Sequence, residues 1–374
     1  MEFLWYILPF ILIFTVLVFV HELGHYLAAR QCKVRVEVFS VGFGKEIFGL
    51  TDKFGTRWRL STIPLGGYVK LFGVLPPDES HDEEVSTSSN DNTSFYKKTT
   101  GQKAWIYFAG PLANLIFAVA VLAVVYSITG KQYLPASIGK VYSNSSAERA
   151  GIKTGDTIIK VGKSSIKRFE QLSSIVRSSP GKDIFLTIKR NNKIIVLEVT
   201  PKPIEIDVGG SKKTIGRLGV SRARNETKFI KYNPLTATWE AIIETLSLSG
   251  LILDYLGQVV SGERSAKELG GPIRIAQISG DVAQTGIISS GVFLLAAFLS
   301  INLGIINLLP IPLLDGGQLL VLGIEALRRK PLEKSLLAVY QNIGLVFIVC
   351  LTIFVFWNDL VQLRFVDYLY GLMK

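Results

Sequence analysis

The fold is decided by a stretch in which ionisable side chains interrupt an apolar run: LVFVHELGHYLAA, residues 17–29. His21 and His25 stand four residues apart, which places both imidazoles on one face of a helix. Two such imidazoles are able to bind one Zn²⁺, with the adjacent Glu22 as general base towards water. A polar helix end outside a membrane is the alternative, but apolar residues continue on both sides. Ionisable groups inside such a segment are costly and indicate a functional site.

Four apolar runs reach the length of about 20 residues that spans the core of a bilayer. They cover Phe3 to about Ala29, Ala104–Ile128, roughly Ile287–Leu309 and about Ile343–Leu363. Hydrophobic residues form 48% of the 374 residues and charged residues only 19%, whereas soluble domains carry about 25% charged residues. This composition excludes a mainly disordered chain. It predicts a polytopic α-helical membrane protein with four transmembrane helices, whose first run lacks the features of a cleaved signal peptide.

The basic residues predict the orientation in the membrane. Short clusters of Lys and Arg follow the first run, precede the second and follow the third, and such clusters stay in the cytoplasm. Both termini and the region 130–285 are then expected outside. Between Lys131 and Lys231, 21 Lys and Arg stand against 8 Asp and Glu, an excess of 13 that exceeds the net charge of +11 of the whole chain. A nucleic-acid binder has this signature, but the flanking spans favour an anionic membrane surface, so no nucleic-acid partner is expected.

The runs divide the remaining chain into segments of different character. Alternating apolar and polar residues with glycine breakers predict short strands and hairpins before a flexible polar linker. Strand patterns, short helices and an Asn-Asn hairpin signal predict a small α/β domain on the outward side. The predicted segments are 1–30 (first span with HELGH), 31–75 (β region), 76–103 (linker), 104–129 (second span), 130–222 (α/β domain), 223–285 (amphipathic helical segment), 286–325 (third span) and 326–374 (cytoplasmic loop, fourth span and short tail).

A catalytic zinc ion needs a third protein ligand and one open position. His81 lies in the acidic linker, where a surface histidine is the simpler interpretation. Asp315 follows the third run within NLLPIPLLDGG, residues 307–317, where two prolines and two glycines break the helix at membrane depth. Irregular backbone is tolerated there only if protein or a water-filled cavity covers it. An acidic residue in that setting suggests a ligand, although Asp315 considered alone could equally cap a helix. The two cysteines form no CxxC, so no sulfur-based zinc site is indicated.

Three motifs, in this order and spacing, resemble one family: HELGH (residues 21–25), FAGPLAN (108–114) and NLGIINLLPIPLLDGG (302–317). Over nearly its whole length the chain is similar to the site-2 protease family of intramembrane zinc metalloproteases, and most to its bacterial RseP/RasP group. The resemblance implies that His21, His25 and Asp315 hold one zinc ion per chain and that Glu22 activates water. It also implies a multi-pass protein of the bacterial inner membrane with its active site towards the cytoplasm.

The resemblance extends to segments expected to engage the substrate. Asn302 and Asn307 lie near the site in the family and position the substrate backbone or stabilise the oxyanion, although as isolated residues they could equally be helix-packing amides. Residues 31–75 resemble a membrane-associated β-hairpin region, where an exposed strand edge can hold an extended peptide by main-chain hydrogen bonds. An ordinary cytoplasmic hairpin stays open as an alternative. The expected substrate-binding positions in this region are Gly42, Phe43, Gly44, Gly67, Tyr68 and Val69.

The outward domain resembles a bacterial PDZ domain through SSAERAGIKTGDTI, residues 145–158. IGRLGV, residues 215–220, resembles the loop that receives a peptide carboxylate, which implies a binding loop at Gly216, Arg217, Leu218 and Gly219. Close relatives carry two PDZ domains in tandem, whereas this sequence contains one. The domain is expected to select trimmed peptide ends or to exclude bulky ectodomains by size.

The resemblance implies peptide-bond hydrolysis in the bilayer during regulated intramembrane proteolysis. The expected partners are lipid and single-span membrane proteins already trimmed by another protease, such as anti-sigma factors or remnant signal peptides. The alternative is a catalytically silent membrane PDZ adaptor, which loss of Glu22 or of any ligand would have favoured. A transporter is disfavoured because the four spans contain no evident inverted repeat. The sequence leaves the oligomeric state open.

Overall fold

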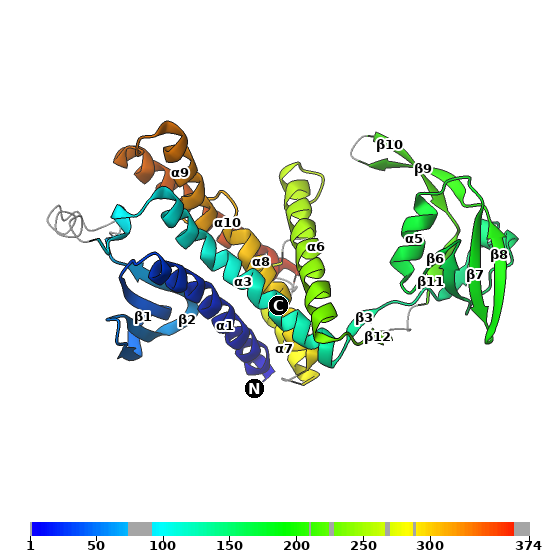
Figure 1. Cartoon of the computed structure of the whole chain (residues 1–374), viewed down its shortest axis with the longest axis horizontal. Helices are drawn as coiled ribbons and strands as arrows, with labels where there is room; N and C mark the ends of the chain where they lie inside the picture. Colours follow the sequence, from blue (N-terminus) through cyan, green and yellow to red (C-terminus); the bar gives the residue numbers. More distant parts are fainter. Residues whose placement is uncertain are drawn as a thin grey trace, which may run out of the picture. The chain divides into compact units, whose positions relative to one another are not determined.

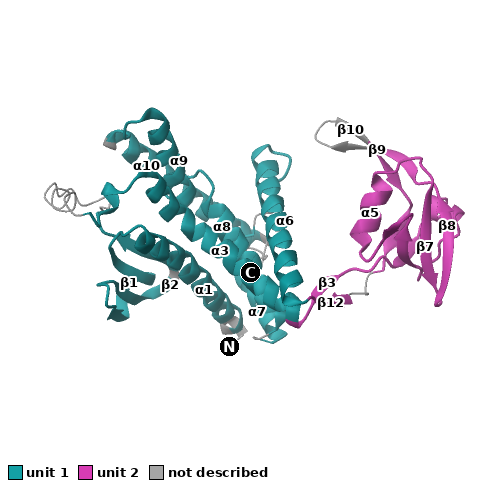
Figure 2. Cartoon of the chain, in the orientation of Figure 1, with its two compact units in different colours: residues 1–127, 233–374 teal, residues 128–232 magenta. Residues whose placement is uncertain are grey.

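The structure is a computed structural model that describes residues 2–73, 92–208, 211–223, 228–265, 270–286 and 289–362. It divides into two compact units, Met1–Ser127 with Asn233–Lys374 and Ile128–Tyr232 (Figure 2). His81, most of the predicted linker and the C-terminal tail lie outside the described residues.

The first unit is built mainly from helices (Figure 1). Five of the helices in the described part of the chain are long and apolar enough to cross a membrane. Four of them, α1, α3, α8 and α10, overlap the predicted apolar runs, and the fifth, α6, falls in the predicted amphipathic segment. The structure therefore supports a membrane protein without establishing the predicted count of four spans. The helices are α1 (Glu2–Gln31), α3 (Thr100–Ile128), α6 (Pro234–Val260), α7 (Pro272–Gln284), α8 (Ser290–Asn307), α9 (Asp315–Arg328) and α10 (Lys334–Gln362), with a 3₁₀ turn at Phe95–Lys97.

Small residues let α3 approach α1 and α8 closely. A Cβ added to Gly24 of α1 would overlap the carbonyl oxygen of Ala109 in α3, and one added to Gly304 of α8 would lie 3.0 Å from the carbonyl oxygen of Pro111. Ser300 of α8 donates a hydrogen bond of 2.8 Å to a carbonyl oxygen of α3. Between apolar helices in lipid, close packing and such hydrogen bonds replace the hydrophobic effect as the source of association. The glycines and the serine therefore hold α1, α3 and α8 together.

Helix α10 contacts two other parts of this unit. The Asp359 carboxylate accepts hydrogen bonds from the backbone N–H groups of Gly271, Ile273 and Arg274, at 2.8, 3.0 and 3.2 Å, and so caps the N-terminus of α7. An acidic side chain is favourable there because the first N–H groups of a helix lack partners and carry partial positive charge. Nearer its start, the Tyr340 hydroxyl donates to the carbonyl oxygen of Gly317 at 3.3 Å. These contacts tie α10 to α7 and to the start of α9.

The segment after α1 forms two long antiparallel strands, β1 (Val36–Thr51) and β2 (Arg57–Leu71), which lie beside α1 (Figure 1). The Phe39 ring stacks on Trp58 with centroids 4.2 Å apart, and Tyr26 of α1 packs edge-on against both rings. Aromatic contacts of this kind add to the stabilisation from buried area. They attach the hairpin to the helix that carries the two histidines.

The second unit is a small α/β domain. Its largest sheet has the strand order β6-β5-β7-β8, and the pairs β4–β11, β9–β10 and β3–β12 accompany it. Helix α5 covers a core that contains Ile138, Ile158, Leu172, Leu186 and Ile188. The elements are β3 (Lys131–Tyr133), β4 (Ile138–Val141), α4 (Ser146–Arg149), β5 (Thr157–Val161), β6 (Ser164–Ser165), α5 (Phe169–Arg177), β7 (Ile184–Arg190), β8 (Lys193–Val199), β9 (Lys202–Val208), β10 (Ser211–Arg217), β11 (Val220–Arg222) and β12 (Lys228–Ile230).

A buried ion pair joins the start of β5 to the end of β7. Asp156 is fully buried and accepts two hydrogen bonds of 2.7 Å from the Arg190 guanidinium and one of 2.7 Å from the backbone N–H of Lys153. Burial raises the pKa of the Asp156 carboxyl, but the hydrogen bonds from Arg190 and Lys153 outweigh it and hold the pKa below its usual value of 3.8. A depressed pKa in the folded state means that the ionised carboxylate stabilises the domain.

Asp156→Asn is expected to lower the free energy of unfolding of this unit by roughly 1.5–3 kcal/mol near neutral pH, because hydrogen bonds to a charged group are lost. The stabilisation is present above the usual pKa and disappears as the pH falls through the lower pKa of the folded state. The difference between wild type and variant should therefore shrink below about pH 4. Hydrogen exchange of the β5 and β7 amides measures it, with the exposed Asp183→Asn as control. Equal exchange protection in wild type and Asp156→Asn at neutral pH would contradict the prediction.

Candidate active site

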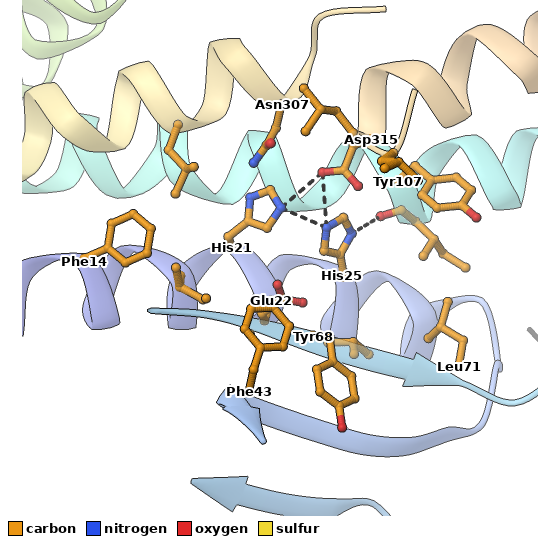
Figure 3. A pocket seen from close by; sticks show the side chains of 18 residues that line it. Phe14, His21, Glu22, His25, Phe43, Tyr68, Leu71, Tyr107, Asn307 and Asp315 are labelled. Carbon is orange, nitrogen blue, oxygen red and sulfur yellow. Dashed lines mark hydrogen bonds and ion pairs between the residues drawn. The ribbon is translucent and has the colours of Figure 1, made fainter. Parts of the chain in front are cut away.

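The two histidines and the aspartate meet beside the end of α1 (Figure 3). The Nε2 atom of His21 lies 3.1 Å from Oδ2 of Asp315 and 3.2 Å from Nε2 of His25, which in turn lies 3.4 Å from the same oxygen. Among the described residues these three form the group of His, Cys, Asp and Glu side chains that is close enough to hold a metal ion. The tertiary structure thus joins candidate ligands that are 290 positions apart in the sequence, at residues 25 and 315.

The three atoms fit a tetrahedral zinc ion. Ligand atoms at 2.0–2.1 Å from zinc, separated by tetrahedral angles, lie about 3.3 Å from one another. The observed separations of 3.1, 3.2 and 3.4 Å match this value. Two imidazole nitrogens and one carboxylate oxygen are also a common donor set for zinc. Three lone pairs directed at one point repel each other unless a cation lies between them, so the residues present fit the metal.

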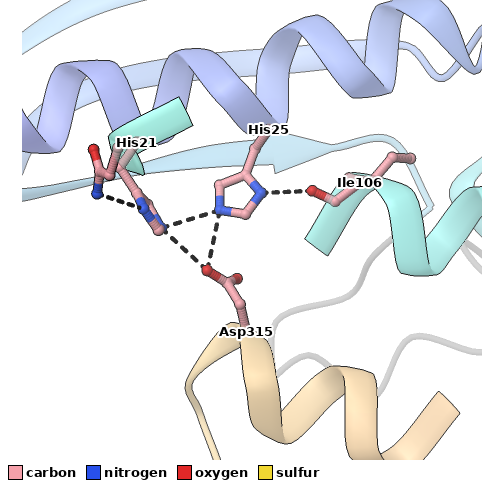
Figure 4. A network of polar contacts seen from close by, with 5 residues as sticks. His21, His25, Ile106 and Asp315 are labelled. Atoms are coloured by element: carbon pink, nitrogen blue, oxygen red, sulfur yellow. Dashed lines mark hydrogen bonds and ion pairs between the residues drawn. The ribbon is translucent and has the colours of Figure 1, made fainter. Parts of the chain in front are cut away.

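Hydrogen bonds orient the imidazoles from α3 (Figure 4). Nδ1 of His25 lies 2.8 Å from the carbonyl oxygen of Ile106 and must donate its proton there. Neutral His25 is therefore left with its lone pair on Nε2, which is the atom directed at Asp315. The neighbouring Gly110 leaves room for the ring, because a Cβ at this position would overlap Nε2 of His25. Nδ1 of His21 lies 3.2 Å from the side-chain amide of Asn114.

The break between α8 and α9 positions Asp315. Helix α8 ends at Asn307 and α9 begins at Asp315, so the predicted third-span segment contains two helices joined by a seven-residue irregular stretch. Leu313 in this stretch has φ of 73°, a conformation that costs a non-glycine residue of the order of 1 kcal/mol or more. A Cβ at Gly316 would overlap the carbonyl oxygens of Leu308 and Leu309. The tight turn thus requires glycine immediately after the carboxylate that faces the histidines.

A cavity of about 490 Å³ lies beside the three ligands and contains Glu22 in its wall. Glu22 is 9% exposed. It follows His21 directly on α1 and precedes His25 by three residues. Of the predicted substrate-binding residues, five line this cavity: Phe43, Gly67, Tyr68, Val69 and Asn307 (Figure 3). The strand residues come from β1 and β2, so the hairpin forms one wall and the helices form the other.

Three of the predicted substrate-binding residues do not line the cavity. Asn302 donates a hydrogen bond of 3.0 Å to the carbonyl oxygen of Phe298 within its own helix. Gly42 and Gly44 have φ of 90° and 91° and form bends in β1. Three residues not singled out from the sequence do contribute to the site, namely Tyr107, Gly110 and Asn114. Gly110 and Asn114 belong to the motif FAGPLAN, but the motif alone does not predict that they contact the histidines.

The predicted peptide-carboxylate loop lies in the second unit. A cavity of about 350 Å³ runs along α5 and is lined on its other side by the end of β10 and the residues that follow it. Val176 and Leu172 contribute apolar walls from α5, and all four predicted loop residues take part: Gly216, Arg217, Leu218 and Gly219. The structure thus places these residues on a groove of their own domain, separate in the sequence from the metal cluster.

Comparisons with known proteins identify the family of this chain. A model of peptidase family M50 matches residues 9–351. A protein of Agrobacterium fabrum that is named as a zinc metalloprotease is 40% identical over 96% of both chains, and one of Rickettsia conorii with a name of the same kind is 38% identical over 96% of this chain and 99% of its own. The metalloprotease MmpA of Caulobacter vibrioides is 34% identical over 96% of both chains. The predictions of a metalloprotease and of zinc as cofactor are confirmed, and the chain belongs to peptidase family M50, the family of the site-2 proteases.

Proposed function

We propose that this chain is an intramembrane zinc endopeptidase that cleaves the transmembrane segments of single-span proteins during regulated intramembrane proteolysis. The observation that carries the proposal is the meeting of His21, His25 and Asp315 at one point beside Glu22, within a cavity walled by apolar helices. Placing charged and polar groups in apolar surroundings costs free energy, and such groups therefore indicate a functional site, here that of a protease.

The proposed reaction assigns a step to each side chain. Zinc held by the three ligands would polarise the scissile carbonyl and make the attacking water more acidic. Glu22 takes the proton from water and delivers it to the leaving amine, as a general base and then acid. Asn307, on the opposite wall of the cavity, is suited to donate a hydrogen bond to the carbonyl oxygen as negative charge develops there.

The proposed substrate lies as an extended strand along the hairpin. Gly67 of β2 lies so close to Glu22 that an added Cβ would be 3.1 Å from Cγ of that residue. Main-chain groups of β2 therefore pass next to the proposed base. A helical substrate must unwind before its carbonyl groups become accessible, and pairing with a strand edge stabilises the unwound form.

The proposed topology has four crossings, with both termini and the second unit outside and the site towards the cytoplasm. The contacts of His25 with Ile106 and of Asp315 with His21 bring the end of α1, the start of α3 and the start of α9, which follows α8 after seven residues, to one level. Because α3 leaves this level and α8 returns to it, the chain between α3 and α8 crosses the membrane an even number of times in this topology. Helix α7, with 13 residues, spans about 20 Å, short of the roughly 30 Å of a bilayer core. Helix α6 therefore packs on α8 without adding a crossing, as the positive clusters in the short loops also favour.

The second unit is proposed to act as one PDZ domain that receives the new ends of substrates already cut by another protease. Its groove between α5 and the loop at Gly216–Gly219 is a suitable size for a few peptide residues, and Arg217 is suited to attract a terminal carboxylate. Lipid and trimmed single-span proteins are thus the proposed partners in a bacterial inner membrane.

Reconstitution with a doubly tagged single-span reporter tests the proposal. The purified chain is expected to cut the reporter within its apolar segment, as mass spectrometry of the products shows. A zinc chelator should stop cleavage, and added Zn²⁺ should restore it. The control is the same reporter with a soluble linker in place of its span. Binding of the reporter without cleavage, in zinc-loaded protein, would instead favour the membrane PDZ adaptor.

A further inference from the structure

Asn114 is a buried amide whose surroundings the reaction above does not explain. It lies in the middle of α3, is 0% exposed, and has its amide nitrogen Nδ2 3.2 Å from Nδ1 of His21. The carbonyl oxygen Oδ1 of this amide has no hydrogen-bond partner within the described part of the chain. A buried polar group without a partner is costly. The presence of this costly group next to His21 indicates that the amide has a role at that imidazole.

The tautomer of His21 decides which amide atom must face the ring. Nε2 of His21 lies 3.1 Å from Asp315 and points at the metal position. An imidazole that binds a metal through Nε2 carries its proton on Nδ1, which then needs an acceptor. An amide N–H cannot accept this proton, but the amide oxygen can, and the oxygen and nitrogen of an Asn side chain occupy nearly equivalent positions. With the amide turned about its Cβ–Cγ bond, Oδ1 takes the position of Nδ2, 3.2 Å from Nδ1 of His21, and becomes the acceptor that this proton needs.

The partner of His25 supports the same arrangement. Nδ1 of His25 donates to the carbonyl oxygen of Ile106 at 2.8 Å, so the backbone of α3 already supplies an acceptor for one of the two imidazoles. Asn114 lies two turns further along the same helix, next to the other imidazole. The two histidines are one turn apart on α1, and α3 packs against α1 through Gly24. One helix thus supplies a polar group to each ring.

The position of Asn114 is secured from the opposite side. Ser300 of α8 is fully buried and donates a hydrogen bond of 2.8 Å to the backbone carbonyl of Asn114. Gly304, one turn later, leaves 3.5 Å between an added Cβ and Cβ of Asn114. Helix α8 leads into the turn that ends at Asp315. Asn114 therefore lies where the helices carrying the ligands meet.

We propose that Asn114 is a positioning residue for zinc: its amide oxygen accepts the Nδ1 proton of His21 and keeps Nε2 unprotonated and directed at the metal. The inference rests on the metal site of the proposed function but not on proteolysis. Removing such a partner from a metal-binding histidine typically weakens metal binding by 10–100-fold. Asn114 does not itself line the cavity and acts on it through His21, so its effect should be on zinc affinity first.

Competition with a chromogenic chelator, on the full chain in detergent, measures the zinc affinity of each variant. Asn114→Leu has a similar size but no acceptor and should bind zinc about 10–100-fold more weakly than wild type. Asn114→Asp retains an oxygen acceptor and should bind zinc at least as tightly as wild type. Asn342→Leu is the matched control, because it makes the same change at an exposed position of α10, and it should stay within about threefold of wild type.

Two further readouts separate positioning from a loss of structure. Co²⁺-substituted Asn114→Leu should show a shifted visible absorption spectrum, whereas Asn114→Asp should retain the wild-type band positions. The inference is overturned if folded Asn114→Leu binds zinc as tightly as wild type, or if Asn114→Asp binds it more than tenfold more weakly. Because neither readout requires cleavage, a wild-type chain that binds zinc but cuts no reporter would refute the proposed function and leave this inference standing.

Discussion

Glu22→Gln is expected to abolish cleavage of a single-span reporter while zinc stays bound. Gln has the size of Glu but cannot take a proton from water, and a general base contributes about 10²–10⁴-fold to the rate. The residue lies beside the ligands, in the wall of the cavity. Cleavage in proteoliposomes, followed by the release of a tagged fragment, should therefore fall by at least about 100-fold. The zinc content of the variant should remain one ion per chain.

Glu333→Gln makes the same chemical change at an exposed position outside the site and serves as the control. It should cleave the reporter at the wild-type rate. Asp315→Ala, by contrast, removes a proposed ligand and should lose zinc and activity together. Unchanged cleavage by purified Glu22→Gln would exclude Glu22 as the general base.

Gly110→Ala is expected to weaken metal binding strongly, although it adds only one methyl group. The new Cβ would overlap Nε2 of His25, the atom that faces the metal position. Either the ring rotates away and loses its hydrogen bond to Ile106, or α3 moves away from α1. Both outcomes separate the ligands. Zinc affinity should therefore fall by about 100-fold or more, because changes to the partners of metal ligands alone already weaken metal binding by about 10–100-fold. Overpacking should also lower the free energy of unfolding by about 1–3 kcal/mol.

Gly101→Ala is the matched control on the same helix, because nothing lies within 4 Å of a Cβ added there. It should bind zinc and cleave the reporter as the wild type does. Isothermal titration with Zn²⁺ and thermal unfolding of the detergent-solubilised chains compare the two variants. A Gly110→Ala chain with wild-type zinc affinity would show that His25 is not confined in the way the structure indicates.

The sequence was sufficient to predict much of the candidate metal site because the necessary information is local. The spacing of His21 and His25 implies one helical face, and their apolar surroundings imply a function for the charge. Asp315 could be proposed because prolines and glycines break an apolar run beside it. The family assignment confirms the enzyme class that these residues predicted.

Other parts could not be predicted because they depend on contacts between helices. Asn302 and Asn307 belong to one motif, yet Asn307 lines the cavity and Asn302 bonds to its own helix. Which of the two lines the cavity depends on which face of α8 turns towards the site. In a helix that is apolar on all sides, the sequence pattern does not indicate that face. Helix α6 shows the same difficulty, since its length and composition suit a span as well as a membrane-bound helix.

The sequence by itself determined the membrane class, the paired histidines with Glu22 between them, and the family. It could do so because helical periodicity and hydrophobicity act over one or two turns. Only the tertiary structure decided that Asp315 lies 3.1 Å from His21, that Gly110 leaves space for His25 and that Asn114 faces His21. Those relations arise where α3 packs between α1 and α8, and close packing places atoms by the shapes of all three helices together.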